Sequence, residues 1–463
     1  MPQYSDYNFS QFGPDTYLLT NMAGRYVFLN KREFDAFVLK NPVADTVEAL
    51  TENYFYSEEN KEAYISDYSS AIRQYKNYLF SGTGLHIFVL TSKCNFHCLY
   101  CQASTKNDGE MMTMEVAKKS VDLALQSPSK FLSFEFQGGE PLENFDVLKY
   151  IVQYVSEHKG ERVIEFNLVS NLTLLTDEMI KFIKEYHICV STSLDGNEVL
   201  QNTNRPLPSG NSYQAWKQKY EQLRSAIDWN IGAIQTTTRF SLSEYQYIVD
   251  EYIRNGFETV FIRPLTPLGY ALSHWDQIGY SAKEFVKFYK NAFRYIISIA
   301  KRGKKIREGH AVILLRKILG HTAGNYTELR SPCGAALGQL AYNYNGRIYT
   351  CDEGRMMAEM GDASFEVGTV ESRYEDLFSG KVCKAMAVSS CLESIPQCAE
   401  CVYSPYCGVC PVLNYESSGS LFSNSPNNYK CQIYHGMLDV IFECLLEKDK
   451  DTIAILREWA QIE

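Results

Sequence analysis

The sequence predicts an α/β fold with parallel strands, preceded by a small α+β unit and followed by a loop-rich, cysteine-rich segment. Three observations predict it. Strand and helix patterns alternate from residue 85 onward, a hairpin pattern followed by helices precedes them, and ten of the 14 cysteines lie beyond residue 330. Alternation of strands with amphipathic helices is typical of parallel βα units.

Composition excludes several classes of protein. Of 463 residues, 45% are hydrophobic and 22% are charged, which is typical of soluble globular chains. The net charge of −10 argues against a general nucleic-acid partner. No apolar run approaches the roughly 18 residues of a membrane span. The polar start, Met1 to Asp6, lacks the plan of a signal peptide. We therefore expect a cytoplasmic protein with neither membrane nor nucleic acid as partner.

Residues 1–82 are predicted to form the small α+β unit. Two short apolar runs, 16–20 and 25–29, flank Asn21-Met22-Ala23-Gly24, which is a plausible hairpin turn. Helical patterns follow at 31–39 and 60–79. The small residues at 81–84, Ser-Gly-Thr-Gly, are interpreted as a linker to the next domain.

Residues 85–320 carry six strand–helix repeats. The expected strands are 86–90, 131–136, 163–169, 188–193, 231–237 and 259–262. The expected helices are 113–126, 145–157, 177–186, 213–227, 243–253 and 281–300. Six repeats indicate a partial barrel or an open doubly wound sheet. In either arrangement the chemistry is expected at the C-terminal ends of the strands.

Residues 321–463 form the third predicted segment. It shows few long periodic stretches before a helical pattern at 432–446. A loop-rich segment of this kind needs disulfides or bound metal to stabilise it, and its thiols can bind metal.

A compact cysteine group follows the first barrel strand. Cys94, Cys98 and Cys101 are separated by three and then two residues, so one loop can aim three thiolates at a single point. Three is one fewer than a closed structural site uses, which leaves a metal position for another ligand. An iron–sulfur cluster with one non-protein ligand suits this spacing, whereas a zinc site or unliganded core cysteines are the alternatives.

The loops after the next strands carry further polar and glycine residues in a fixed order. They are Gly138-Gly139-Glu140-Pro141, Ser170-Asn171, and Ser193-Leu194-Asp195 with Arg205 beyond it. Glycines permit close approach of the backbone, and a carboxylate offers a partner to an ammonium group. Each of these motifs alone is weak, but together with the cysteine group they are strong.

With these motifs the sequence resembles the radical S-adenosylmethionine (SAM) enzymes. The resemblance implies a partial (β/α)6 barrel in which Cys94, Cys98 and Cys101 hold a [4Fe–4S] cluster and SAM chelates its fourth iron. It further implies SAM-binding roles for the following residues: Tyr100, Gly138, Gly139, Glu140, Ser170, Asn171, Ser193, Asp195 and Arg239. A solvated strand-end arginine is the alternative for Arg239.

The resemblance also implies the chemistry. One electron from the reduced cluster splits SAM into methionine and a 5′-deoxyadenosyl radical, which abstracts hydrogen from a carbon atom of the substrate. A reducing partner similar to flavodoxin or ferredoxin is implied as the electron source. The substrate carbon must lie in a pocket that excludes other hydrogen donors.

The C-terminal cysteines resemble the SPASM extension of radical SAM enzymes, which carries two auxiliary [4Fe–4S] clusters. By this resemblance Cys398, Cys401, Cys407 and Cys431 hold an outer cluster, and Cys333, Cys351 and Cys410 contribute to an inner one. A zinc ribbon is the alternative for the close pairs.

Two departures from that pattern concern the inner cluster. Only two residues separate Cys407 from Cys410, and no cysteine shortly precedes Cys333. The inner cluster is therefore expected either to have an open iron site or a non-cysteine ligand, or to recruit Cys383 or Cys391. Cys189 and Cys444 lie in apolar patterns and are interpreted as core residues.

Asp352 directly follows Cys351. At the matching position in sulfatase-maturating enzymes, an aspartate accepts a proton during side-chain oxidation. The resemblance therefore implies that Asp352 is the catalytic base. A carboxylate that supports a cluster ligand or caps a helix is the alternative.

The N-terminal unit resembles the winged-helix-like element that binds leader peptides, and a decorative cap on the barrel is the alternative. Across much of the chain the sequence is most similar to the His-Xaa-Ser system radical SAM maturases, notably at 18–21, 28–29 and 401–412. These resemblances predict a maturase that acts on a ribosomally made precursor peptide and installs a cross-link, an oxidation or an epimerisation. An iron–sulfur electron carrier and a zinc-stapled peptide-binding adaptor are the alternative functions.

Overall fold

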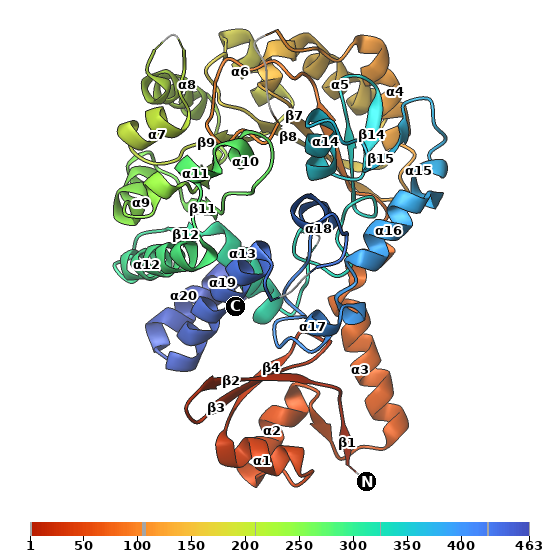
Figure 1. Cartoon of the computed structure of the whole chain (residues 1–463), viewed down its shortest axis with the longest axis vertical. Helices are drawn as coiled ribbons and strands as arrows, with labels where there is room; N and C mark the ends of the chain where they lie inside the picture. Colours follow the sequence, from red (N-terminus) through yellow and green to blue (C-terminus); the bar gives the residue numbers. More distant parts are fainter. Residues whose placement is uncertain (1, 104–107, 209, 325, 424–425, 463) are drawn as a thin grey trace.

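The computed structural model of the chain describes residues 2–103, 108–208, 210–324, 326–423 and 426–462. Its centre is a ten-stranded sheet with the order β12-β11-β10-β9-β8-β7-β6-β13-β14-β15. Strands β6 to β11 are parallel and lie in sequence order, as a partial barrel requires. Figure 1 shows this barrel at one end of the molecule and the N-terminal unit at the other.

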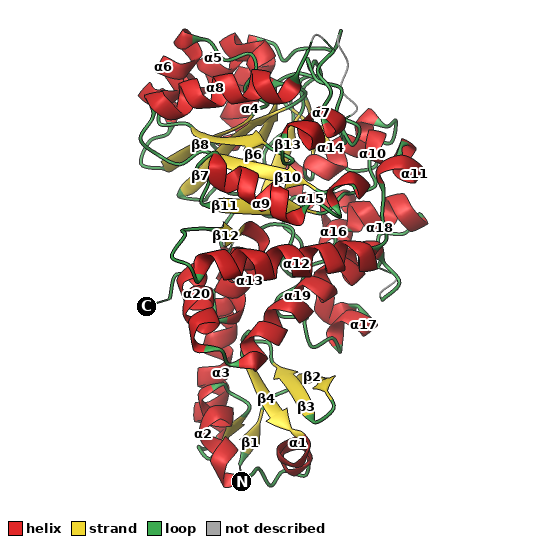
Figure 2. Cartoon of the chain, turned by 90° about the vertical axis from the view of Figure 1, so that its left-hand side faces the viewer, coloured by secondary structure: helices red, strands yellow, loops and turns green. Residues whose placement is uncertain are grey.

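The barrel strands follow the predicted alternation closely. They are β6 (Leu85–Val89), β7 (Phe131–Gln137), β8 (Val163–Val169), β9 (Cys189–Ser193), β10 (Gly232–Thr236), β11 (Thr259–Arg263) and β12 (Arg307–Glu308). The helices that connect them are α4 (Met114–Ala124), α5 (Phe145–His158), α6 (Asp177–Glu185), α7 (Glu198–Asn204), α8 (Ser212–Ala226), α9 (Tyr245–Arg254), α10 (Tyr270–Ser273), α11 (Trp275–Ile278), α12 (Ala282–Ala300) and α13 (Gly309–Ile318). Helices α4, α5, α6 and α8 cover the outer face of the sheet in Figure 2.

Strand β7 shows how the sequence separates the two faces of this sheet. Leu132, Phe134 and Phe136 are buried in the core that the sheet forms with the helices. Glu135 and Gln137 alternate with them and line the cavity inside the barrel. Because successive side chains of a strand point to opposite faces, an apolar outer face leaves a polar inner wall.

The N-terminal unit is an antiparallel sheet, β2-β3-β4, with three helices. Its elements are β1 (Gln3–Tyr4), β2 (Asn8–Gly13), β3 (Thr16–Thr20), β4 (Tyr26–Asn30), α1 (Lys31–Val38), α2 (Ala44–Glu52), β5 (Tyr56–Ser57) and α3 (Lys61–Tyr75). The predicted turn is confirmed: Gly24 N donates to Asn21 O at 3.0 Å, and Gly24 has a φ of +69°. Asn30 and Glu33 form a capping box that starts α1.

The C-terminal segment continues the barrel sheet instead of standing apart from it. Its elements are β13 (Gln339–Tyr342), β14 (Arg347–Tyr349), α14 (Asp352–Glu359), β15 (Glu366–Thr369), α15 (Asp376–Ser379), α16 (Lys381–Ser389), α17 (Pro396–Ala399), α18 (Pro411–Ser418), α19 (Tyr429–Glu447) and α20 (Lys450–Ala460). Strand β13 pairs in parallel with β6, so the cysteine-rich segment and the first barrel strand share one sheet. Helix α19 packs along α12, and α20 along α13.

Several expectations need correction. The tail is richer in short helices and strands than its sequence predicted, and α13 and α20 were missed. Residues 81–84 are not a free linker, because Gly84 N donates to Gly338 O at 3.1 Å and Gly84 O accepts from Ser133 N at 2.7 Å. Cys444 is a core residue as expected, with 0% exposure. Cys189 is not: it is only partly buried, and its Sγ lies 4.0 Å from Glu165 Oε1 on the neighbouring strand.

Among the described residues, no helix combines the length and the apolar character that a membrane crossing requires.

Candidate functional site

A cavity of about 370 Å³ opens at the C-terminal ends of the barrel strands. The loops after β6, β7 and β8 line it, together with the ends of β9, β10 and β11 and the start of α14. This is the edge at which parallel α/β folds place their sites. The structure thus brings the cysteine group and residues of the motifs after β7, β8 and β9 together around one space.

The three cysteines of the first group line this cavity side by side. Cys94, Cys98 and Cys101 all belong to the loop after β6. Two hydrogen bonds shape the loop: Phe96 N donates to Cys94 Sγ at 3.4 Å, and Cys101 N donates to Cys98 O at 3.1 Å. Burial raises the pKa of the Cys94 and Cys98 thiols. Thiolates at this place therefore need a compensating positive charge, and a bound metal cluster supplies it.

The two glycines after β7 are required by the close approach of the cysteine loop. Gly138 has a φ of +145°, and a Cβ there would lie 2.4 Å from Thr91 O. A Cβ on Gly139 would lie 1.9 Å from Lys93 O. Any larger residue would push the loop of Cys94 away from the strand end, because these contacts are to backbone atoms. This packing role accounts for both glycines without any ligand.

Glu140 is buried and is held by three donors. Its carboxylate accepts from Leu142 N at 3.1 Å, Ser170 Oγ at 2.7 Å and Asn171 N at 2.8 Å. Burial raises the pKa of Glu140 to about 7, and the hydrogen bonds oppose that rise. The side chain therefore fastens the loop after β7 to the loop after β8. Asn171 extends the connection to the cysteine loop, because its Nδ2 donates to Asn95 Oδ1 at 2.8 Å.

Tyr100 and Asp195 form one buried network with Arg205. Tyr100 Oη donates to Asp195 Oδ2 at 2.6 Å, and Arg205 Nη2 lies 3.1 Å from Asp195 Oδ1. The Arg205 guanidinium also lies over the Tyr100 ring, 5.1 Å from its centroid. Tyr100 and Arg205 line the cavity. Asp195 is 0% exposed and lies behind them, where its carboxylate orients both side chains. Ser193 lies on the cavity wall as predicted.

Arg239 does not reach the cavity. Its Nε donates to Gly279 O at 2.8 Å and its Nη1 donates to Asp276 O at 2.8 Å, on the exposed side of the barrel. The guanidinium is held by the carbonyls of α11 and of the residue that follows it. The prediction of a SAM contact for Arg239 is therefore not supported, and the alternative of a solvated strand-end arginine describes it better.

Asp352 reaches the cavity from the C-terminal segment. It is the first residue of α14 and forms an ion pair with Arg355 one turn later. Arg355 is 2% exposed. Arg355 does not line the cavity, whereas Asp352 does. The ion pair therefore engages Asp352 Oδ1 while the side chain of Asp352 still reaches the cavity.

Sequence reasoning missed several cavity residues, among them three with charged or amide side chains. Glu135 and Gln137 are hydrogen-bonded neighbours on β7, and Arg263 ends β11. Burial raises the pKa of Glu135, and the carboxylate of Asp352 raises it further. The signal was present: a polar residue at every second position of an apolar strand that ends in Gly-Gly-Glu marks an inner barrel wall.

The C-terminal cysteines gather in the two predicted groups. Burial raises the pKa of the Cys407 thiol. The neighbouring thiols of Cys401, Cys431 and Cys398 raise that pKa further. Cys333, Cys351 and Cys410 lie in a second buried cluster with Met357 and Phe365. Within the described residues, no three His, Cys, Asp or Glu side chains converge closely enough for one metal ion.

Residues 88–234 match the family model of the radical SAM superfamily. In sequence, the chain is 28% identical over 227 residues to an uncharacterised protein of Methanocaldococcus jannaschii, covering 49% of this chain and 77% of that one. It is 26% identical over 278 residues to the cysteine-type anaerobic sulfatase-maturating enzyme of Clostridium perfringens, covering 57% of this chain and 72% of that enzyme.

Two solved structures share the fold. The structure of anSMEcpe with bound AdoMet and a peptide covers 79% of this chain and 98% of its own, with a TM-score of 0.66 and 21% identity. Streptococcus suis SuiB bound to the precursor peptide SuiA covers 92% of this chain and 99% of its own, with a TM-score of 0.55 and 15% identity. At these identities the likeness establishes the fold and not the reaction.

The family match over residues 88–234 and the arrangement of the strands together give this chain the α/β partial barrel of the radical SAM superfamily. More particularly, it is related in sequence to the anaerobic sulfatase-maturating enzymes and has the fold of anSMEcpe and SuiB.

Proposed function

We propose that the chain is a maturase that modifies a residue of a ribosomally made precursor peptide by abstracting hydrogen from carbon. One observation carries the proposal: a single cavity brings the three thiols of the first group together with Glu140 and Asp352. The relatives support the peptide substrate, since both solved structures hold a peptide. A cross-link, an oxidation and an epimerisation remain the proposed products.

Each wall of the cavity has a proposed role. Cys94, Cys98 and Cys101 would hold a [4Fe–4S] cluster, and Glu140, Ser170, Asn171 and Ser193 would contact SAM. When bound and reduced, the cluster and SAM supply the 5′-deoxyadenosyl radical that removes the hydrogen atom. Tyr100 and Arg205 shape the SAM side, where Asp195 fixes both of them.

Asp352 is the proposed catalytic base. Its carboxylate lines the cavity, and its ion pair with Arg355 limits the positions it can adopt. A carboxylate so placed can accept the proton that a substrate heteroatom releases during oxidation. Glu135 stands on the same cavity wall as Gln137 and is a further candidate for contact with the substrate.

The remaining parts of the proposal concern electrons and the peptide. Two auxiliary [4Fe–4S] clusters at the C-terminal cysteine groups would accept an electron from the substrate, and a flavodoxin- or ferredoxin-like protein would deliver the initiating one. Strands β2 and β4 are the edges of the N-terminal sheet, and either could receive a leader peptide as an added strand. The finer assignment to the His-Xaa-Ser system maturases, the domain limits 1–82, 85–320 and 321–463, and a cytoplasmic location stay predictions.

The test is anaerobic reconstitution followed by incubation with SAM, dithionite and precursor peptides encoded near the gene. We expect 5′-deoxyadenosine together with a peptide whose mass has changed. A brown protein that forms no 5′-deoxyadenosine would instead be an electron carrier. A colourless protein with stoichiometric zinc would be a peptide-binding adaptor. SAM cleavage that no peptide stimulates would point to a small-molecule substrate.

A further inference from the structure

A second cavity, of about 530 Å³, lies at the N-terminal ends of the barrel strands, away from the proposed SAM site. The starts of β10, β11 and β12 and the last turn of α8 line it. Three of its wall residues also line the first cavity, namely Ser191, Ile234 and Arg263. Its volume is within the range of small-molecule sites, roughly 300–1,000 Å³. No step of the proposed function uses this space.

Three guanidinium groups line this second cavity, which we call the arginine cavity; they belong to Arg224, Arg263 and Arg307. Contacts with the barrel hold two of them in place. Arg224 Nη1 donates to Asn255 O at 2.7 Å, and a Cβ on Gly256 would collide with the same guanidinium. Arg307 Nε donates to Thr259 Oγ1 at 2.9 Å. Each of these hydrogen bonds uses one nitrogen, so further N–H groups of both side chains can serve a ligand.

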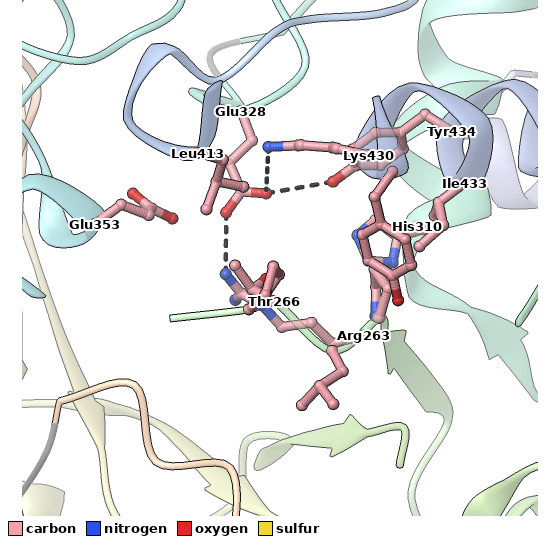
Figure 3. Close-up of a pocket in the computed structure, with 13 residues that line it drawn as sticks. Arg263, Thr266, His310, Glu328, Glu353, Leu413, Lys430, Ile433 and Tyr434 are labelled. Carbon is pink, nitrogen blue, oxygen red and sulfur yellow. Dashed lines mark hydrogen bonds and ion pairs between the residues drawn. The ribbon is translucent and has the colours of Figure 1, made fainter. Parts of the chain in front are cut away.

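The third guanidinium, that of Arg263, is only partly neutralised. Its Nη2 lies 3.0 Å from Glu328 Oε1, but Lys430 Nζ lies 3.9 Å from the other oxygen of that carboxylate. Tyr434 Oη donates to the same oxygen at 3.3 Å. Figure 3 shows the three contacts converging on Glu328. One carboxylate therefore serves two cations.

The arginine cavity gathers more positive than negative charge, although the chain as a whole has a net charge of −10. Glu258 is the only carboxylate among the described residues that line it. In the same part of the chain, no carboxylate lies within ion-pair distance of Arg224 or Arg307. Trp229 also lines the cavity, and its buried Nε1 has no hydrogen-bond partner among the described side chains and backbone. Guanidinium groups left without carboxylates suit the oxygens of a bound phosphate or carboxylate.

We propose that the arginine cavity is a second ligand site, which binds a small anion with several phosphate or carboxylate oxygens. Arg224 and Arg307 contact these oxygens from α8 and β12, and Trp229 offers a further N–H donor. Phe261 and Tyr326 provide apolar walls for an organic part of the ligand. The site goes beyond the proposed function and does not depend on it, since neither SAM nor an iron–sulfur cluster takes part.

The test is isothermal titration calorimetry of the full chain with inorganic pyrophosphate at low ionic strength. We expect saturable binding that sodium chloride weakens, because salt screens the charges, and that excess SAM leaves unchanged. Arg224→Gln and Arg307→Gln should each weaken binding about 10- to 100-fold, as expected for the loss of a charged hydrogen bond. Glu258→Gln should tighten binding, because it removes the opposing carboxylate. This opposite effect keeps the test decisive if circular dichroism shows that an arginine variant does not fold.

The matched control is Arg254→Gln at the end of α9, which changes the charge equally but removes a guanidinium that is paired with Glu251. It should bind pyrophosphate as the wild type does. Citrate is titrated in parallel, and binding of citrate with the same dependence on Arg224 and Arg307 would support the site and assign it to carboxylates. The proposal is overturned if neither anion binds saturably, if Arg254→Gln weakens binding as much as the cavity variants, or if Glu258→Gln has no effect. Competition between SAM and pyrophosphate would also overturn it, because the anion would then occupy the first cavity.

Discussion

Glu140 and Asp352 are two carboxylates of the cavity whose surroundings differ sharply. Glu140 is 1% exposed and accepts hydrogen bonds from the loops after β7 and β8. Asp352 keeps 17% of its side chain exposed and is held by one buried arginine. The first arrangement fixes the shape of the proposed SAM side, and the second leaves a carboxylate free to meet the proposed substrate. Substitutions at the two positions should therefore fail in different ways.

Glu140→Gln should weaken SAM binding and lower the rate of 5′-deoxyadenosine formation. An amide oxygen is a poorer acceptor than a carboxylate for Asn171 N and Ser170 Oγ, and the loss of a charged hydrogen bond costs about 1.5–3 kcal/mol, or roughly 10- to 100-fold in affinity. Equilibrium dialysis with SAM measures the effect. Glu143→Gln in the same loop, outside the cavity lining, is the control. Unchanged SAM cleavage in Glu140→Gln would favour the electron-carrier function.

Asp352→Asn should uncouple SAM cleavage from peptide modification. The amide cannot accept the proton, and loss of a general base typically lowers a rate by about 10²–10⁴-fold. We expect 5′-deoxyadenosine to form while modified peptide falls by at least the lower figure. Liquid chromatography of both products from one reaction gives the ratio, with 5′-deoxyadenosine as the internal reference. A parallel fall of both products would assign Asp352 a structural role instead.

At the scale of elements, short polar contacts decide how the last barrel strand and helix join. Glu308 ends β12 and caps α13, and it is 0% exposed. Its carboxylate accepts from Ile262 N on β11 at 3.2 Å, from Tyr289 Oη on α12 at 2.7 Å and from Ala311 N at 2.6 Å. One side chain thus ties a strand and two helices together at the edge of the barrel.

This junction should make the stability of the metal-free protein depend on pH. Burial raises the pKa of Glu308 to about 7, above its ordinary value of 4.5. The folded state therefore keeps a proton that the unfolded chain releases, and the stabilisation is lost as pH rises through 7. The full effect of one such group is on the order of 3 kcal/mol.

Glu308→Gln should remove that share of the pH dependence. We expect the urea midpoint of the variant to be lower than that of the wild type at pH 5, with a shallower decline between pH 5 and 7.5. Circular dichroism during urea titration measures it. Glu284→Gln, an exposed cap of α12, is the control and should keep the wild-type slope. Equal slopes for Glu308→Gln and the wild type would contradict the assignment.

At the scale of the whole molecule, the N-terminal unit is packed on the loop that carries the outer cysteines. Thr20 Oγ1 donates to Val402 O at 2.6 Å, and Asn8 Nδ2 donates to Ala399 O at 2.8 Å and to Cys401 O at 3.0 Å. Phe442 of α19 meets three aromatic rings of the unit. A peptide bound to this unit would therefore lie on an element that directly contacts the loop of the outer cysteines.

Thr20→Val should loosen the outer cysteine loop. It leaves the buried Val402 carbonyl without its donor, which costs about 1–3 kcal/mol. We expect faster amide hydrogen exchange in residues 399–406 and a lower iron content after reconstitution. Mass spectrometry of exchanged peptides measures the first effect. Gln11→Ala, which breaks contacts only within its own turn, is the control. Unchanged exchange at 399–406 would mean that the loop is held without the N-terminal unit.

The sequence by itself determined the order of strands and helices in the barrel and the grouping of the thiols. Both depend on features that are local in the chain, namely the periodicity of apolar residues and the spacing of cysteines within single loops. Only the tertiary structure decided the direction of Arg239, the exposure of Cys189 and the pairing of β13 with β6. These features arise from contacts between segments far apart in sequence, which no local pattern encodes.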